Sequence, residues 1–284
     1  MKRTEDKAGE IRKQVSKDYA RDVSTPGPKG CCRTDPKGVL AKVAGYSAEE
    51  VAALPAEAAT NSFGCGNPVA LADVKEGQTV LDLGCGAGID VILAAKRVGP
   101  KGKVIGVDMT DEMIAKAKAN VKAAGLTNVD VRRGIIEDLP VESSSVDLVI
   151  SNCVINLSPE KEKVFKEIAR VLKQGGGISI SDIVAEELPP EIVAHPALYS
   201  SCVSGAVSEK KYVQGLQDAG LTDVEVRDRL VYDRSQMEAL IGSEVKEADA
   251  PTCCGSQAPF SLGKEWAKKL AGKVWSVRVV GRRA

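Results

Sequence analysis

Short apolar segments alternate with longer segments of helical periodicity through the middle of the chain. Runs rich in Val, Ile and Leu predict five strands at 79–83, 103–108, 129–133, 146–151 and 177–183. Helices are predicted between them at 89–98, 111–124 and 158–173. Thr110 can cap the second of these helices, and Ser158-Pro159 places a cap and a proline at the start of the third. Strands that alternate with helices of this length are typical of a parallel sheet.

The remaining segments extend this pattern at both ends of the chain. Apolar runs at 224–232 and 274–280 bring the expected number of strands to about seven. A helix is expected near 10–23, and the capping box Ser47-Ala-Glu-Glu50 predicts a short helix ending near Pro55. Beyond the fifth strand, helical stretches are predicted at 191–203 and 209–219. The fold class is therefore α/β, a Rossmann-like seven-stranded mostly parallel sheet with helices on both faces, plus a smaller α/β region.

Three parts of the chain are expected on this pattern. Residues 1–68 form an N-terminal segment with cysteine-bearing loops, and residues 69–183 form the core of the sheet. Residues 184–284 form a further region whose last strands complete the sheet.

Charge and hydropathy narrow the possible partners. Among 284 residues, Lys and Arg together number 39 and Asp and Glu together also number 39, so the net charge is zero. Proteins that bind nucleic acid usually carry a basic excess, so no nucleic-acid partner is expected. The apolar runs are too short for a membrane span, and the charged N-terminus has no signal-peptide core. We expect a cytoplasmic protein with no membrane partner.

A glycine-rich turn, Leu81-Asp-Leu-Gly-Cys-Gly-Ala-Gly88, follows the first strand and precedes a helix. Glycines let the backbone approach a ligand closely, and a helix N-terminus offers unpaired amide groups. The spacing is G-x-G-x-G, which differs from the dinucleotide pattern G-x-G-x-x-G. Asp82 precedes the glycines, and Asp108 ends the next strand, where an acid can bind ribose hydroxyls. A glycine turn alone also occurs in other doubly wound proteins.

This turn resembles motif I of the class I, Rossmann-like methyltransferases. The resemblance continues through 134–138, 146–151 and 170–176 and covers roughly residues 70–183. It implies S-adenosyl-L-methionine as the cofactor, with no metal cofactor. Asp82, Gly84, Gly86 and Gly88 would form the loop at its methionine end, and Asp108 would hold the ribose. Met109 would lie against the adenine, Ile136 and Glu137 would flank it, and Asn152 would help to close the pocket.

The chain has eight cysteines: Cys31, Cys32, Cys65, Cys85, Cys153, Cys202, Cys253 and Cys254. In a reducing compartment such thiols favour metal binding, redox work or nucleophilic chemistry. Ser151-Asn152-Cys153 ends the fourth strand, where ligands of such sheets bind. The one histidine, His195, precedes a proline outside the core, which favours chemistry without a general base. Trivalent arsenic fits, because it prefers thiolate ligands and keeps a nucleophilic lone pair.

Three cysteine segments resemble the arsenite S-adenosylmethionine methyltransferases: 151–157, 63–68 and 201–206. The resemblance implies that Cys65, Cys153 and Cys202 bind arsenic(III) and that Cys31 or Cys32 is a redox partner of Cys65. It also implies stepwise methylation of arsenite, a detoxification, with thioredoxin or glutathione as the reductant. Residues 184–284 would then contain the acceptor-binding region.

Other interpretations remain open for single residues and for the whole chain. Cys85 lies inside the glycine turn, where a small structural residue suffices. Cys253-Cys254 is either an arsenite-capture pair or an incidental exposed dithiol, and His195 is expected at the surface. The alternative functions are methylation of a small organic acceptor at carbon, for which the matched cysteines have no use, and arsenic binding by a non-catalytic thiol protein, which would not need Asp82 and Asp108.

Overall fold

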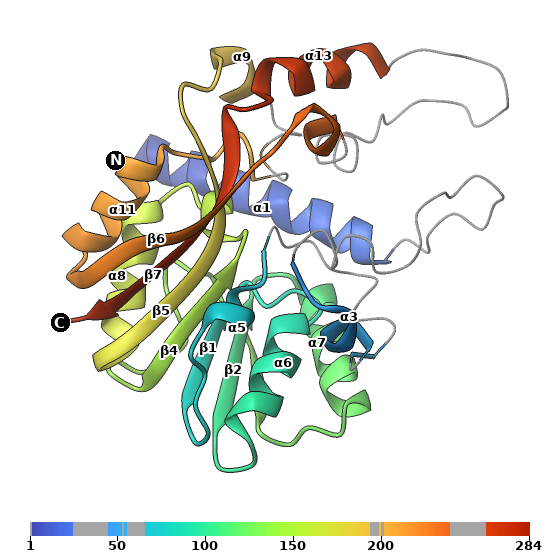
Figure 1. The fold of residues 1–284 in the computed structure, drawn as a ribbon. Helices are drawn as coiled ribbons and strands as arrows, with labels where there is room; N and C mark the ends of the chain where they lie inside the picture. Colours follow the sequence, from blue (N-terminus) through green and yellow to red (C-terminus); the bar gives the residue numbers. More distant parts are fainter. Residues whose placement is uncertain are drawn as a thin grey trace, which may run out of the picture.

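Seven strands form one sheet in the order β3-β2-β1-β4-β5-β7-β6 (Figure 1). The computed structural model describes residues 2–24, 45–52, 54–55, 66–193, 199, 202–238 and 260–284. The strands are β1 Thr79–Leu83, β2 Lys103–Asp108, β3 Val129–Arg133, β4 Val146–Asn152, β5 Leu172–Ala185, β6 Leu221–Val231 and β7 Val274–Arg283. β1 to β5 pair in parallel, whereas β7 is antiparallel to both β5 and β6. The predicted Rossmann-like, mostly parallel sheet is confirmed.

Helices lie on both faces of this sheet, with α6 and α7 on one side and α8 and α11 on the other (Figure 1). The described helices are α1 Lys2–Ser24, α3 Ala48–Ala52, α5 Pro68–Leu71, α6 Ile89–Val98, α7 Asp111–Ala123, η1 Ile155–Leu157, α8 Lys161–Val171, α9 Pro190–Val193, α11 Glu209–Asp218 and α13 Phe260–Leu270. In the described part of the chain, no helix is long and apolar enough to cross a bilayer.

Side-chain alternation along the central strand separates two apolar cores. Val80 packs with α6 and α7, and its neighbour Leu81 packs with α8 and α11. Because successive residues of a strand point to opposite faces, a strand that is buried on both faces needs apolar residues at every position. Val80, Leu81 and Leu83 of β1 meet this requirement, and one carboxylate, Asp82, is buried with them.

The order of the strands creates a crevice at one edge of the sheet. β1 pairs with β2 on one side and with β4 on the other, so the connections from these strands run in opposite directions. Ligands of such sheets bind outside the carboxyl ends of the strands at this switch point. A third apolar cluster, which includes Val15, Cys153, Ile183, Cys202 and Trp266, lies over this end of the sheet.

Several predicted elements differ from the structure at their ends. α1 begins at Lys2 and is much longer than the helix predicted near 10–23. α8 begins at Lys161 and not at Ser158, because the Ser158 hydroxyl accepts from the Glu160 amide in a turn before the helix. The helix also ends early, because Leu172 already pairs with Val146 at the start of β5. Its predicted extension to residue 173 is wrong.

The predicted helix caps have different outcomes. The capping box is confirmed, since the Glu50 amide donates to Ser47 Oγ at 3.1 Å and the Ser47 amide donates to Glu50 Oε2 at 2.9 Å. Thr110 stands at the first position before α7, but its hydroxyl makes no capping bond. Its amide instead donates to the Asp108 carboxylate, so Thr110 orients the carboxylate at the end of β2 and does not cap α7 with its side chain.

Candidate active site

An open cavity lies at the carboxyl ends of β1, β2 and β4. Its walls come from the glycine turn, the ends of β2 and β4, the segment after β3, and helix α1. Seven residues predicted to bind the cofactor line it: Gly84, Gly86, Asp108, Met109, Ile136, Glu137 and Asn152.

The glycine turn has a backbone that side chains would obstruct. Gly84 has a φ of 63°, and a Cβ at this position would lie 2.3 Å from Val154 Cγ2. Gly86 has a φ of 50°, and its amide donates to Asp108 Oδ2 at 3.0 Å. Gly88 precedes α6 with a φ of 92° and is not among the residues that line the cavity. The turn therefore presents backbone to the cavity because the first two glycines permit it.

Asp108 is held at the end of β2 by backbone donors. Its Oδ1 accepts from the Thr110 amide at 2.9 Å, and its Oδ2 accepts from Gly86. Burial raises the pKa of this carboxyl, and these hydrogen bonds oppose the rise. The sequence-predicted ribose acid is thus fixed in orientation and lines the cavity.

Two more carboxylates are buried near the glycine turn. Burial raises the pKa of Asp82 well above its ordinary value, and the charges of Asp90 and Asp108 raise it further. Burial also raises the pKa of Asp90 to about 6, although hydrogen bonds from Tyr46 and Asn152 lower it. Asp90 lines the cavity and Asp82 does not. A cationic ligand would relieve the repulsion among these groups.

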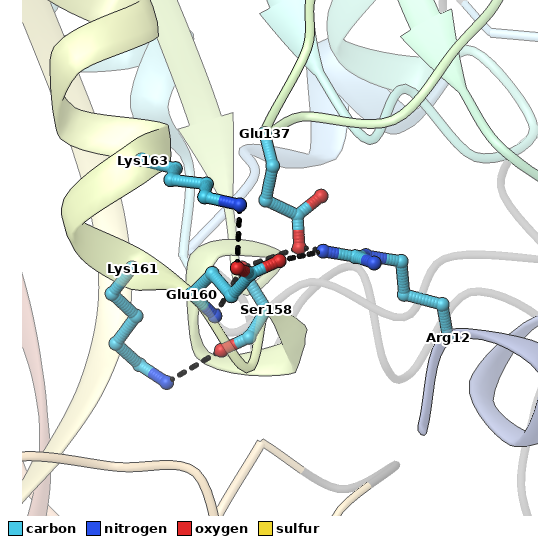
Figure 2. Close-up of polar contacts among 6 residues, drawn as sticks. All are labelled: Arg12, Glu137, Ser158, Glu160, Lys161 and Lys163. Carbon is cyan, nitrogen blue, oxygen red and sulfur yellow. Dashed lines mark hydrogen bonds and ion pairs between the residues drawn. The ribbon is translucent and has the colours of Figure 1, made fainter. Parts of the chain in front are cut away.

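Helix α1 closes one wall of the cavity through an arginine between two carboxylates. Arg12 Nε donates to Glu137 Oε1 at 3.0 Å, and its guanidinium also contacts Glu160 (Figure 2). The Glu137 side chain is only 4 % exposed, and the Ser158 hydroxyl donates to the same oxygen at 2.6 Å. Burial lowers the pKa of Arg12, but the two carboxylates raise it more. The positive charge of Arg12 therefore balances the negative charge of Glu137.

Helix α1 was not predicted from the sequence to be part of the site. A signal was present, because Ala8, Ile11, Val15, Tyr19 and Val23 recur at helical spacing and form one apolar face. Val15 and Tyr19 line the cavity beside Arg12. Tyr46 was also missed; its hydroxyl donates to Asp90 Oδ1 at 2.7 Å.

Two of the predicted arsenic-binding cysteines meet beside the cavity. Cys153 follows β4 and lines the cavity, and the Cys202 thiol donates to the Cys153 carbonyl at 2.7 Å. Both are buried, and both have left-handed backbones with φ of 56° and 62°. Such conformations are uncommon for residues other than glycine and cluster at functional sites. Cys153 is disulfide-bonded, whereas Cys202 is not part of a disulfide.

Cys65 lies outside the described residues, but its neighbour Gly66 is held at this site. The Gly66 amide donates to Asn152 Oδ1 at 3.1 Å, and the Gly66 carbonyl accepts from Asn152 Nδ2 at 2.7 Å. A Cβ on Gly66 would lie 2.6 Å from the Ser181 side chain. Asn152, which directly precedes Cys153, thus ties the chain beside Cys65 to the end of β4.

Cys85 belongs to the glycine turn and also lines the cavity. It is a free thiol whose pKa is raised by burial, and its sulfur packs against Gly106. Cys31, Cys32, Cys253, Cys254 and His195 lie outside the described residues.

This chain is similar in sequence to known methyltransferases. A methyltransferase-domain family model matches residues 74–220. Arsenite methyltransferase from Halobacterium salinarum is 46 % identical over 210 residues, which are 74 % of this chain and 53 % of that protein. The Mus musculus arsenite methyltransferase is 32 % identical over 83 % of this chain and 65 % of its own length. The chain thus spans about half to two thirds of the length of these relatives.

A solved structure supports the same relationship. The crystal structure of an arsenic(III) S-adenosylmethionine methyltransferase from Chlamydomonas reinhardtii is 32 % identical, with a TM-score of 0.59. The match covers 87 % of this chain and 73 % of that chain.

Proposed function

Because this chain belongs to the arsenite methyltransferase family, we propose that it transfers methyl groups from S-adenosylmethionine to trivalent arsenic held on cysteine thiolates. The observation that carries the proposal is the meeting of Cys153 and Cys202 beside a cavity formed by the glycine turn and Asp108. The pocket for the methyl donor and the two thiols that would bind arsenic therefore lie next to each other.

The residues of the cavity fit S-adenosylmethionine. Asp108 is oriented to accept hydrogen bonds from ribose hydroxyls, and the backbone of Gly84 and Gly86 is accessible to the methionine end. The buried Asp82 and Asp90 favour the positively charged groups of this ligand. When bound, S-adenosylmethionine supplies an electrophilic methyl group on a sulfonium.

The apolar cluster around Cys153 and Cys202 fits arsenic as the acceptor. Arsenite, As(OH)₃, can form an As–S bond with each thiol and release one water per bond, and thiolates are preferred by such a soft centre. Arsenic on sulfur would keep a lone pair that could form the As–C bond as the S–CH₃ bond breaks and S-adenosylhomocysteine leaves, so no proton would have to be removed. The chain then acts mainly by positioning the two reactants and by keeping water from the thiols with residues such as Leu157 and Trp266.

The third sulfur and the redox cycle are part of this proposal. Asn152 anchors Gly66 beside Cys153, so Cys65 is one residue from a segment fixed at the site. We assign Cys65 as the third thiol ligand and Cys31 or Cys32 as its redox partner. The disulfide at Cys153 must be reduced before arsenic binds there, a step for which thioredoxin or glutathione is suited.

One incubation separates this function from its alternatives. The full chain is mixed with arsenite, a thiol reductant and S-adenosylmethionine labelled at the methyl group. Labelled methylarsenicals are expected. A thiol trap would retain arsenic without forming them, and a carbon methyltransferase would neither form them nor need its cysteines; either result would contradict the proposal.

The affinity for S-adenosylmethionine is expected to fall as the pH is lowered, because Asp90 becomes protonated. Its pKa of about 6 in the free protein exceeds the ordinary value, and a bound cation favours the ionised carboxylate. Protonation therefore competes with the ligand, and affinity should drop about tenfold between pH 7 and pH 5. Calorimetric titration with S-adenosylmethionine checks this, with Asp90→Asn as the variant in which the dependence should shrink. A fall of equal size in that variant would show that another group titrates.

Arg12→Gln is expected to weaken the donor site. Loss of the ion pair leaves Glu137 buried without its cation and loosens α1 over the cavity, so the KM for S-adenosylmethionine should rise about fivefold while kcat changes little. Arg21→Gln is the matched control, since Arg21 lies on the same helix, is 60 % exposed and pairs with Asp18 at the surface. Equal KM values for the two variants would remove Arg12 from the site.

A further inference from the structure

We propose that Lys161 is a positioning residue that fixes the spacing between the Cys153 and Cys202 thiols through the turn after Cys153, against which the Cys202 segment packs. This inference rests on the proposed function, because the spacing matters when both sulfurs bind one arsenic. Lys161 is the first residue of α8 and lies outside the cavity walls described above.

The Lys161 side chain folds back onto the turn after Cys153. Its Nζ donates to the Ser158 carbonyl at 2.9 Å and to the Asn156 carbonyl at 3.3 Å. Both carbonyls belong to the turn around η1 that connects Cys153 to α8. In Figure 2, Lys161 extends toward the Ser158 carbonyl, whereas Lys163 extends toward Glu160. The ammonium of Lys161 therefore holds this turn, and it forms no ion pair with the part of the chain that the structure describes.

The segment of Cys202 rests on the same turn. A Cβ added to Gly205 would lie 2.0 Å from the Asn156 carbonyl oxygen and 3.6 Å from Lys161 Nζ. The Asn156 carbonyl is thus shared, since it accepts from Lys161 and also contacts Gly205. Because Gly205 is three residues after Cys202, a shift of this carbonyl would move the Cys202 segment against Cys153.

The buried carboxylate of Asp182 stabilises the turn around η1 through Asn156. Asn156 Nδ2 donates to Asp182 Oδ1 at 2.8 Å, and the Tyr212 hydroxyl donates to Asp182 Oδ2 at 3.0 Å. Burial lowers the pKa of Lys161, and the negative charge of Asp182 opposes this change.

Thiol spacing has a chemical consequence that separates it from thiol reactivity. An arsenical with two exchangeable positions gains affinity only if two sulfurs already lie at the right separation. An arsenical with one exchangeable position binds a single sulfur and is insensitive to the spacing. Phenylarsine oxide and dimethylarsinous acid are probes of these two kinds.

The test compares Lys161→Met with the matched control Lys163→Met in the reduced full-length chain. Lys163 is two residues away on the same helix, 59 % exposed and paired with Glu160. Lys161→Met should bind phenylarsine oxide about tenfold or more weakly and raise the KM for arsenite. Dimethylarsinous acid binding, S-adenosylmethionine affinity and kcat should stay within about threefold, and Lys163→Met should match the wild type in every measurement.

A second variant keeps the inference testable if Lys161→Met does not fold. Gly205→Ala disturbs the same turn from the Cys202 side without a change of charge, and it should show the same selective loss of phenylarsine oxide binding. Wild-type affinity in both variants would overturn the inference, as would equal weakening of both arsenicals, which would mean that Lys161 acts on thiol charge. A wild type that chelates phenylarsine oxide but releases no methylarsenicals would contradict the proposed function while the positioning role stands.

Discussion

Cys153→Ser and Cys202→Ser should each reduce arsenite methylation by more than about 100-fold. Serine is smaller and its oxygen is a poor ligand for a soft centre, so arsenic loses one bond at a site where both sulfurs are needed. The Cys202 thiol lies 2.7 Å from the Cys153 carbonyl, so both thiols belong to one site. The measurement is the rate of methylarsenical formation with labelled S-adenosylmethionine.

Cofactor binding and a third cysteine provide the controls for these variants. Both serine variants should bind S-adenosylmethionine nearly as tightly as the wild type, because the substituted groups are acceptor ligands in this account. Cys85→Ala should lose much less activity, since Cys85 is a free thiol of the glycine turn whose sulfur packs against Gly106. Full activity in both serine variants would remove the thiolate mechanism, and complete loss in Cys85→Ala would show that this residue has more than a structural role.

Asp108→Ala should lower the affinity for S-adenosylmethionine by at least about 100-fold. Hydrogen bonds to a charged group contribute about 1.5–3 kcal/mol each, and two ribose hydroxyls depend on this carboxylate in the proposed complex. The substitution also frees the Gly86 and Thr110 amides, which the carboxylate accepts from at 3.0 and 2.9 Å. Equilibrium binding of S-adenosylmethionine measures the effect.

Asp111→Ala is the matched control for this substitution. Asp111 begins the next helix, is 70 % exposed and pairs with Arg133 at the surface. It should bind the cofactor like the wild type. If Asp108→Ala also retained wild-type affinity, the assignment of the ribose site would be wrong, whatever the fate of the acceptor site.

Much of the fold could be predicted because its elements are short, regular and local. β1, β2, β3 and α6 begin and end where the sequence pattern places them. Each has clear boundaries, such as the glycine turn between β1 and α6 and the Gly99-Pro100 pair after α6. Apolar runs set the strands and glycines set their ends, so neither depends on distant contacts.

The limits of α1 and α8 could not be predicted in the same way, because distant contacts decide them. α1 is held in place by the ion pairs of Arg12 with Glu137 and Glu160, which are distant in sequence. At Ser158, local propensity favoured a helix start, but its hydroxyl is engaged by Glu137 and Glu160. Glu137 is distant in sequence from both Arg12 and Ser158, and Glu160 belongs to a turn that the sequence pattern did not predict.

The candidate site was predictable as a set of motifs but not as a geometry. Asp108, Gly84, Gly86 and Cys153 were placed by their position at strand ends. The approach of Cys202 to Cys153 depends on Gly205 against the Asn156 carbonyl, a long-range contact that no local pattern encodes. The roles of Arg12, Tyr46 and Lys161 arise from the same kind of contact.

X-ray absorption at the arsenic edge tests the central claim most directly. Reduced protein loaded with one equivalent of arsenite should show arsenic surrounded by three sulfurs and no oxygen, and Cys202→Ser should lose one of these sulfurs. Arsenic that keeps oxygen ligands in the wild type, or the same sulfur count in both proteins, would contradict an acceptor site built on these thiols.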